Sequence, residues 1–551
     1  MIERPLEMRL TGSARRVSDP VVKAGATAPG PKTAGPGAPG ARWQTWMPAV
    51  PALVTFAVTT WGIGSASFWR DEAATLSATR RPLPDLIAML GHVDAVHGAY
   101  YLLMWPLAHV VGVSEVVMRL PSAVAMAAAA GGVAAGGRRL GSWQAGLCSG
   151  LVFAALPMTS RYGQEARSYA LVTAAAVLAS YLLVRVITTP GRRWLVGYGL
   201  SLAALGSLNI FGLLIVPAHA VTLAATRRRP THGSAGGEKA DGGREPAGGG
   251  EGDGADPGTG VLRGWLIAVA AAVVGVSPVA LFAWRERAQF AWLLNQKPGW
   301  QALYALVTGL TGSVVSFALI AALSVLAVLG GGRRDHARLG RRDHARLGRR
   351  RLVWLGAPWL IVPSALLFAV SQVDPAYQLR YLVFCVPAVA ILAGAGLAEF
   401  TRYWGIAALV ALVALVALAL PSQISIREPA GHGDNIRAAA QVLQARARPA
   451  DDVIYDDPGT RTDSLAYPYG FTGLRDISLL TTPSETQNLG GTQVSPRLLA
   501  SRLAGARRVW LIEVAAQPQV PPVMAAMPFR RVRAWQIGAM TLWLYVRETP
   551  H

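Results

Sequence analysis

Two adjacent carboxylates stand at the end of the first long apolar run of the sequence. The run WMPAVPALVTFAVTTWGIG is followed directly by SFWRDEAAT, residues 67–75, in which Asp71 and Glu72 come after Trp69 and Arg70. A carboxylate at the edge of a lipid bilayer costs desolvation energy, so it is expected to pair with a cation or to serve a site. The stretch is therefore either an ordinary solvated loop start or the position of a catalytic base at a membrane surface.

Three further stretches repeat this arrangement of charged and aromatic side chains beside apolar runs. They hold Asp94, His97 and Tyr101; then Arg161, Tyr162, Glu165, Arg167 and Tyr169; and finally Arg380 and Tyr381. All of them fall on one side of the membrane in the topology derived below. Ion pairing alone explains such a set less well than it explains any single residue, so the set favours a binding or catalytic site.

Composition places the whole chain among membrane proteins. Of its 551 residues, 52% are hydrophobic and 15% are charged, whereas a soluble domain has about 25% charged residues. Many apolar runs approach or exceed the roughly 18 residues that predict a membrane-spanning helix. Residues 1–45 are rich in Pro, Gly and Ala, which predicts a disordered cytoplasmic tail.

The net charge of +21 is distributed as in a membrane protein. Arginine clusters stand between apolar runs, at Arg138-Arg139, Arg192-Arg193, Arg227–Arg229 and 333–351. An excess of Lys and Arg marks the cytoplasmic loops of membrane proteins. The clusters therefore predict the cytoplasmic face and argue against a nucleic-acid partner.

The apolar runs predict about eleven membrane-spanning helices. They cover residues 47–66, 120–137, 143–160, 169–187, two helices within 194–226 that meet near Asn209, 264–284, 304–329, 352–371, 381–398 and 404–421. The run at 98–112 is short and contains Pro106, and counting it as a span would put Arg138 and Arg139 outside. We therefore assign it to the membrane interface. With a cytoplasmic amino terminus, the site candidates all lie on the outer face.

Two long segments within the membrane domain, residues 46–421, are predicted to be flexible cytoplasmic loops. Residues 227–263 are rich in Gly and polar side chains, and residues 330–351 contain RRDHARLG twice in succession. The histidines of this repeat are compatible with a metal site, but their arginine neighbours favour a basic loop expanded by duplication. Such a loop attracts anionic lipid headgroups.

The pattern changes in residues 422–551. NIRAAAQVLQARA has helical periodicity, and DDVIYDD, RRVWLIEV and MTLWLYVRE have the composition of short strands. These features predict a small extracytoplasmic α/β domain after the membrane domain. Within it, YDDPGTRTD (455–463) lacks the Gly and the final Glu of a calcium-binding loop, which favours a plain turn.

Three motifs resemble the amino-terminal half of the GT-C superfamily of integral-membrane glycosyltransferases. They are FWRDEAATLSA, VDAVHGAYYLLMWPLAHVVGVSEVVMRLPSA and SRYGQEARSYAL, in this order and spacing. The likeness is to the branch typified by protein O-mannosyltransferases and the lipid A aminoarabinose transferase, and it covers residues 47–225. QLRYLVFCVPAVAILAGAGL extends it weakly to about residue 398.

The resemblance implies a GT-C-like fold and a polyprenyl-phosphate-linked sugar as donor. Transfer would take place on the extracytoplasmic face, and the Ala-, Gly-, Arg- and Val-rich composition points to the plasma membrane of a high-GC bacterium. Mannose is favoured by the family likeness, with arabinose, galactose and aminoarabinose left open. The acceptor is a protein, a lipid or a glycan.

The resemblance also assigns roles to individual residues. Asp71 occupies the family's catalytic position, Glu72 stands beside it, and Glu165 occupies a second acidic position. The family's His-Pro-Pro-Leu-Tyr motif reads His97-Gly98-Ala99-Tyr100-Tyr101 here, so the histidine and the aromatic side chains are kept while both prolines are missing. The expected substrate-binding residues are Asp94, His97, Tyr101, Arg161, Tyr162, Arg167, Tyr169, Arg380 and Tyr381.

Glycosyl transfer from a lipid phosphate needs a base for the acceptor hydroxyl and positive charge for the leaving phosphate. We expect Asp71 to be the base, with Glu165 and Asp94 positioning it or holding a divalent cation, Mg²⁺ or Mn²⁺, together with it. Arg167 and Arg380 suit the phosphate because a guanidinium matches its geometry. The tyrosines are expected to line the sugar or lipid pocket, or to form an aromatic belt at the membrane interface.

Two other functions fit the membrane architecture. A transporter or flippase for lipid-linked sugars typically carries charged or broken helices near the membrane midplane. The predicted spans are nearly free of charge, and the acids stand at their outer ends, which favours the transferase. A non-catalytic membrane scaffold leaves the acids of the two outer loops unexplained.

Overall fold

The computed structural model describes residues 44–227, 257–286, 297–329, 339–514 and 520–548. Nearly all of the predicted tail (1–45), most of the predicted loop 227–263 and the first part of the predicted loop 330–351 lie outside these ranges. The side chains of the two repeat histidines are likewise not described.

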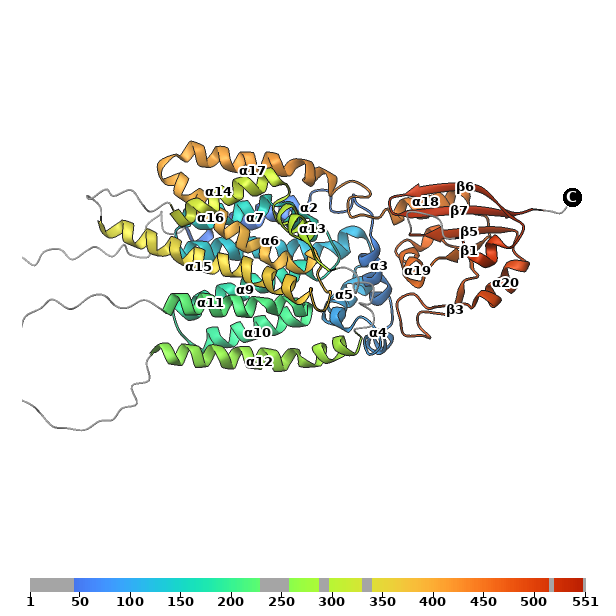
Figure 1. Ribbon diagram of the computed structural model, residues 1–551, viewed down its shortest axis with the longest axis horizontal. Helices are drawn as coiled ribbons and strands as arrows, with labels where there is room; N and C mark the ends of the chain where they lie inside the picture. The colour runs from blue at the N-terminus through green and yellow to red at the C-terminus, as the bar shows by residue number, and fades with distance from the viewer. Residues whose placement is uncertain (1–43, 228–256, 287–296, 330–338, 515–519, 549–551) are drawn as a thin grey trace, which may run out of the picture. The chain divides into compact units, whose positions relative to one another are not determined.

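Apolar helices dominate the chain as far as Ser425 (Figure 1). In chain order they are α2 (Ala49–Thr60), α5 (Gly98–Val110), α6 (Glu115–Leu140), α7 (Trp143–Ala155), α8 (Pro157–Gly163), α9 (Tyr169–Thr188), α10 (Arg192–Leu208), η2 (Ile210–Leu214), α11 (Ile215–Arg227), α12 (Pro257–Arg285), α13 (Trp300–Thr311), α14 (Val314–Leu329), α15 (Leu339–Val370), η4 (Leu379–Cys385), α16 (Val386–Tyr403) and α17 (Gly405–Ser425). Within the described residues, 6 helices are long and apolar enough to cross a membrane. The pair α13 and α14, bent by 74°, makes a seventh if it is counted as one span.

The predicted class of polytopic helical membrane protein is thus confirmed, but the count of eleven spans is not reached by length and composition. Several predicted spans form shorter helices: α2 has 12 residues, α7 has 13 and α10 has 17. The predicted span 143–160 is broken at Leu156, whose extended backbone (ψ 129°) is the conformation that a following proline imposes. The run at 98–112 forms α5, of 13 residues.

Helices also extend into both predicted loops. α12 begins at Pro257 and α15 begins at Leu339, so residues 257–263 and 339–351 are helical rather than flexible. Residues 339–351 are rich in Arg, Leu and Ala, which have high intrinsic helix propensity. The prediction of a loop considered only the charge of this segment.

Small residues allow α16 to pack at the centre of the bundle, between α7 and α14. A Cβ atom at Gly394 would lie 2.4 Å from the Cα of Ser149, and one at Gly396 would lie 1.8 Å from the carbonyl oxygen of Leu323. Neither distance is sterically possible, so only glycine permits these contacts. Close packing of small residues is a main source of helix association in membranes.

The chain from Ser425 onward forms an α/β domain. Its elements are α18 (Ile436–Arg446), β1 (Asp452–Tyr455), α19 (Pro458–Ser464), η5 (Pro468–Gly470), β2 (Arg475–Asp476), β3 (Leu479–Thr481), β4 (Thr492–Gln493), α20 (Pro496–Ala504), β5 (Arg508–Glu513), α21 (Pro522–Ala525), β6 (Phe529–Ile537) and β7 (Met540–Arg547). The main sheet has the order β2-β1-β5-β7-β6. β1 runs parallel to β2 and β5, and β7 runs antiparallel to β5 and β6.

The predicted helix and the three predicted strands correspond to α18, β1, β5 and β7. β6 was not predicted, because three arginines interrupt its apolar pattern. Among the described strands it pairs with β7 alone, and charged residues are typical of such an edge strand.

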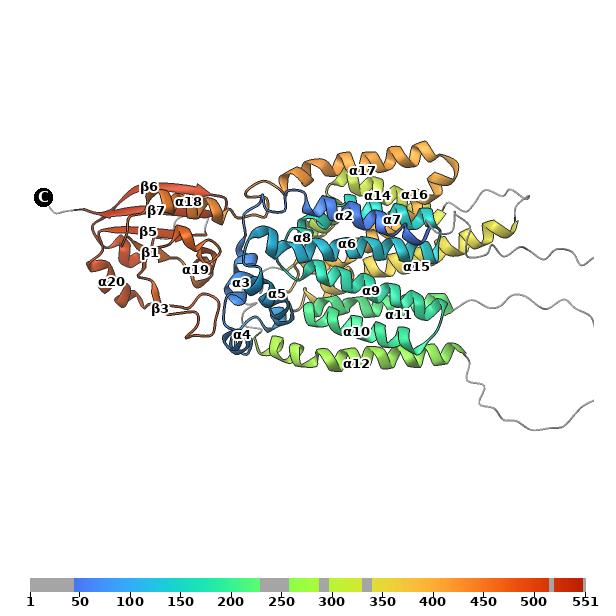
Figure 2. The same ribbon diagram turned by 180° about the vertical axis from the view of Figure 1, so that it is seen from behind.

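Three short elements connect the long helices to this domain: α3 (Arg70–Thr79), α4 (Leu83–Leu90) and η1 (Ala95–His97). Figures 1 and 2 show α3 and α4 between the bundle and the sheet. The Tyr467 hydroxyl accepts a hydrogen bond from the Phe68 amide (2.8 Å) and donates one to Glu115 (2.5 Å). Arg437 also pairs with Glu115, at 2.6 Å. The α/β domain thus forms hydrogen bonds to the segment just before α3, which carries Asp71, and to the start of α6.

Candidate active site

A cavity of about 450 Å³ lies where α3, the start of α9, η4 and the α/β domain meet. It is lined by seven of the predicted residues, Asp71, Asp94, His97, Arg167, Tyr169, Arg380 and Tyr381. The remaining lining residues are Arg70, Ala74, Pro458, Gly459, Thr462, Asp463, Asn488, Leu489, Gly490 and Gly491. The cavity therefore combines residues that stand more than 300 positions apart in the sequence.

Asp71 and Arg380 form an ion pair in the cavity wall. Asp71 stands in the first turn of α3, and Arg380 stands in η4. The Nη1 of Arg380 donates to the Oδ2 of Asp71 at 2.6 Å, and the two side chains are 21% and 20% exposed. The Nε of Arg380 has no hydrogen-bond partner among the described residues. The carboxylate is thus reachable from the cavity and lies next to a partly exposed cation.

Arg167 is held on the same cavity by a second set of hydrogen bonds. It donates to the Tyr101 hydroxyl (3.0 Å) and to the Nε2 of His97 (2.9 Å). Tyr101 in turn donates to Asp94 at 2.7 Å. Burial, followed by the nearby charge of Arg167, lowers the pKa of His97 well below its usual range, so its Nε2 accepts as a neutral ring. Tyr101, which does not line the cavity, orients Arg167 from behind.

Glu72 faces the protein core, although it is adjacent to Asp71. Its two carboxylate oxygens accept from the Nε (2.7 Å) and the Nη2 (2.6 Å) of Arg119, and both side chains are 0% exposed. The Ala166 amide also donates to Glu72, at 2.8 Å. Glu72 does not line the cavity, because successive positions of a helix point about 100° apart. The predicted catalytic position of Glu72 therefore lies outside the cavity, and its side chain is held in a buried ion pair.

Glu165 lies behind the cavity wall, in the turn between α8 and α9. It accepts from Arg161 at 2.8 Å through Oε2, while its Oε1 has no hydrogen-bond partner among the described residues. Burial raises the pKa of Glu165 to about 7, although Arg161 opposes the shift. Arg161 also stacks on Trp69, 5.1 Å from the ring centre. Tyr162 packs edge-on against Tyr169, with 5.3 Å between the ring centres. None of Arg161, Tyr162 and Glu165 lines the cavity.

The predicted metal site is not assembled by these residues. Asp71 and Glu165, its expected ligands, are each engaged by an arginine. Across the described part of the chain, no three His, Cys, Asp or Glu side chains are grouped as metal ligands. We therefore derive no step through a metal ion.

The α/β domain contributes part of the cavity that the sequence did not predict. α19 begins at Pro458, and the side chain of Asp457 caps it by accepting from the Thr460 amide at 2.7 Å. An N-cap aspartate followed by proline is a typical helix start. YDDPGTRTD contains this signal, so the prediction of a plain turn was wrong, and the segment begins a helix.

Asp463 is the notable residue of this wall. Its side chain is 1% exposed, its Oδ2 lies 3.6 Å from the Nε of Arg70, and its Oδ1 has no hydrogen-bond partner among the described residues. Burial raises the pKa of Asp463 to about 8, with Arg70 opposing the shift. Asp463 is thus the third carboxylate of the cavity, after Asp71 and Asp94, and it is supplied by the α/β domain.

Comparisons with known proteins agree with this architecture. Residues 99–234 match the family model described as dolichyl-phosphate-mannose-protein mannosyltransferase. Comparison with the curated proteins finds no match. The crystal structure of ArnT from Cupriavidus metallidurans in the apo state is 12% identical with a TM-score of 0.56, and the alignment covers 92% of this chain and 98% of that one. ArnT bound to undecaprenyl phosphate gives 13% identity and a TM-score of 0.53, with 91% and 98% covered.

The chain therefore has an ArnT-like fold, and the predicted fold class is confirmed. The family match over residues 99–234 agrees with the predicted resemblance. At 12% identity the structural likeness concerns the fold. The chemistry has to be argued from the cavity itself.

Proposed function

We propose that this protein is a membrane glycosyltransferase that moves a sugar from a polyprenyl-phosphate donor to an acceptor hydroxyl. The main supporting observation is the Asp71–Arg380 pair in the cavity wall, 2.6 Å apart and partly exposed, with Arg167 on the same cavity. One carboxylate and two guanidinium groups are what a base and a phosphate-binding site require. The family match over residues 99–234 and the fold of a protein crystallised with undecaprenyl phosphate add support.

The reaction follows as a single displacement. Asp71 removes the proton of the acceptor hydroxyl as the oxygen attacks the anomeric carbon. The bond from that carbon to the phosphate oxygen breaks at the same time, and the bonding electrons leave with the lipid phosphate. Arg380 and Arg167 hold the departing negative charge, because guanidinium groups form charge-assisted hydrogen bonds to phosphate oxygens. The sugar is transferred with inversion.

Both substrates can reach this cavity from different sides. Tyr169 and Tyr381, which stand at the starts of the helical segments α9 and η4, face the lipid-linked donor. Tyr381 stacks on Phe211 with 4.6 Å between the ring centres, which fixes the plane of its ring. The acceptor enters along α19 and the 488–491 loop, where Asp463 orients it. We favour mannose as the sugar, the outer face of a bacterial plasma membrane as the location, and a protein, lipid or glycan as the acceptor.

The test is an in vitro transfer assay with radiolabelled polyprenyl-phosphate sugars in detergent. Asp71→Asn should lower turnover about 10²- to 10⁴-fold, the usual contribution of a general base, while leaving expression unchanged. Asp85→Asn is the matched control, because Asp85 is an exposed carboxylate of the same outer segment. Normal turnover of a well-expressed Asp71→Asn variant would end the base assignment. Transfer in detergent also excludes a transporter as the explanation, since transport requires a sealed bilayer.

A further inference from the structure

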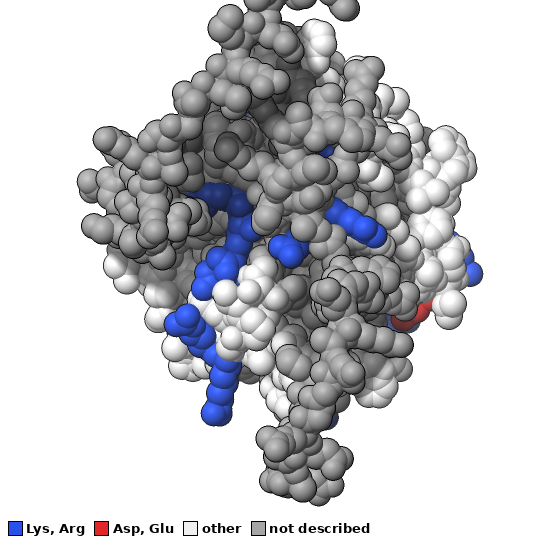
Figure 3. Space-filling view, turned by 90° about the vertical axis from the view of Figure 1, so that its left-hand side faces the viewer, with Lys and Arg blue, Asp and Glu red and all other residues white. Residues whose placement is uncertain are grey.

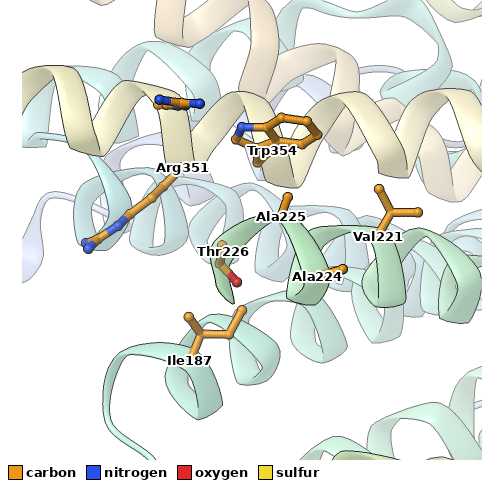
Figure 4. Close-up of a pocket in the computed structure, with 8 residues that line it drawn as sticks. Ile187, Val221, Ala224, Ala225, Thr226, Arg351 and Trp354 are labelled. Atoms are coloured by element: carbon orange, nitrogen blue, oxygen red, sulfur yellow. The ribbon is translucent and has the colours of Figure 1, made fainter. Parts of the chain in front are cut away.

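A second cavity lies at the other end of the helix bundle. Its volume is about 630 Å³, and three helices supply its walls: α9 through Ile187, α11 through Val221, Ala224, Ala225 and Thr226, and α15 through Arg350, Arg351 and Trp354. Figure 4 shows Arg351 and Trp354 on α15 next to the end of α11, with Ile187 on the neighbouring helix. None of these residues lines the first cavity.

The distance along α9 places the two cavities on opposite membrane faces. Tyr169 at the start of α9 lines the first cavity, and Ile187 near its end lines the second. These residues are 18 positions apart, which at about 1.5 Å per residue is roughly 27 Å. The hydrocarbon core of a bilayer is about 30 Å thick. The second cavity therefore opens at the depth of the lipid headgroups of the opposite leaflet.

Among the described residues, the polar part of this cavity is positive and has no acidic partner. Arg350 and Arg351 are exposed, and neither has a hydrogen-bond or ion-pair partner within the described ranges. Their neighbour Arg349, by contrast, pairs with Glu399 at 3.2 Å. The hydroxyl of Thr226 already donates to the carbonyl oxygens of Thr222 and Leu223. The two free guanidinium groups are thus the cavity's available binding groups, and they select an anion.

The rest of the lining is apolar. Ile187, Val221, Ala224 and Ala225 form an aliphatic wall, and Trp354 is 39% exposed beside it. A water-soluble anion gains nothing from such a wall, whereas a lipid places its acyl chains there. Tryptophan is also enriched at the depth where headgroups meet acyl chains.

The surrounding surface has the same sign of charge. Figure 3 views this end of the molecule, and Lys and Arg side chains predominate over Asp and Glu among its described atoms. Basic pockets between membrane helices are suited to anionic lipid headgroups, since each arginine near the surface adds to the attraction.

We propose that this cavity binds an anionic glycerophospholipid, with its phosphate between Arg350 and Arg351 and its acyl chains along α9 and α11. The occupant is a lipid rather than a soluble phosphate because charge and aliphatic surface are combined in one cavity. This site is separate from the sugar-transfer site, so its test does not depend on enzymatic activity.

The test is native mass spectrometry of the full-length protein in detergent, titrated with phosphatidylglycerol, phosphatidylcholine or glycerol phosphate. Phosphatidylglycerol should bind more tightly than the other two. The R350Q/R351Q double variant should lose about 25-fold in affinity, because each arginine near an anionic lipid contributes about fivefold. The matched control is R192Q/R193Q, which removes two exposed arginines from the same end of the bundle without altering the cavity lining. It should change the affinity less than twofold.

A second variant tests the apolar wall and keeps both arginines. Ala224→Trp fills the aliphatic side of the cavity and should weaken phosphatidylglycerol binding while leaving the thermal stability of the protein unchanged. Equal losses in R350Q/R351Q and R192Q/R193Q would mean a diffuse charge effect and would overturn the proposal. Equal binding of phosphatidylcholine, or binding of glycerol phosphate as tight as that of the lipid, would overturn it as well.

Discussion

The cavity wall around Asp71 and the core around Glu72 are two neighbouring regions that use the same chemistry differently. Each contains a carboxylate paired with an arginine at 2.6 Å. The Glu72–Arg119 pair is 0% exposed, and Arg119 also donates to the carbonyl oxygens of Ile63, Ala66 and Ser67. The Asp71–Arg380 pair is about one fifth exposed, and Arg380 keeps a free Nε. A fully buried pair whose donors are all used has a structural role, whereas a partly exposed pair in a cavity wall is available to a ligand.

The largest effect on folding is expected at the buried pair. Glu72→Gln leaves the Arg119 guanidinium uncompensated in the core, which costs about 3–5 kcal/mol when one member of a buried pair is removed. The folded fraction after mild heating, measured by size-exclusion chromatography in detergent, should fall sharply. Glu428→Gln is the matched control, since Glu428 is exposed. A Glu72→Gln protein as stable as Asp71→Asn would remove the distinction between the two regions.

A smaller effect, on donor binding, is expected at the open pair. Arg380→Gln should raise the apparent KM for the lipid-linked sugar about 10- to 100-fold, because a hydrogen bond to a charged group contributes about 1.5–3 kcal/mol. Arg380→Lys keeps the charge without the guanidinium fork, so it should restore part of the affinity. An unchanged KM in Arg380→Gln, with normal stability, would show that Arg380 does not contact the donor phosphate.

Glu165 lies between these two cases, because it is buried but is bound by one arginine only, and its effect is expected to appear only as the pH changes. Its pKa of about 7 lies above its ordinary value of 4.5, so the folded state holds a proton that the unfolded state releases. The stabilisation is complete below about pH 4.5 and is lost as the pH rises through about 7, by at most about 1.4 kcal/mol per pH unit.

Apparent melting temperatures measured from pH 4.5 to 8 should therefore show the wild type losing stability relative to Glu165→Gln as the pH rises. Asp463 shifts in the same direction, but it is present in both proteins, so its contribution cancels in the difference. A difference that does not vary with pH would mean that Glu165 stays ionised, as a fully compensated pair does.

The site candidates were largely predictable because their local signals are strong. Charged residues beside apolar runs single out Asp71, Asp94, His97, Arg167 and Arg380, and all of these line one cavity. Glu72 carries the same local signal as Asp71. The two acids point to different sides of α3, one toward the cavity and the other toward the core. The sequence does not show which side of this helix faces the core.

Other features were beyond local reasoning for different reasons. The wall formed by α19 and Asp463 depends on contacts between segments about 390 positions apart, and no short motif predicts which turn of the α/β domain meets α3. The broken helices α7 and α8 follow from Pro157, but whether a proline bends or ends a helix depends on its neighbours in the bundle. The second cavity combines the ends of α9 and α11 with the interior of α15, which are distant in the chain.

The sequence by itself determined that the chain is a polytopic helical membrane protein with an α/β domain, because hydropathy and periodicity are local properties. Three motifs in order also carried the resemblance to the GT-C superfamily, and the observed fold agrees with it. The tertiary structure alone decided which of two adjacent acids faces the cavity, which arginine pairs with each, and which part of the α/β domain completes the cavity. The physical reason is that burial and charge pairing depend on the surroundings of a side chain, and these come from segments that only folding brings together.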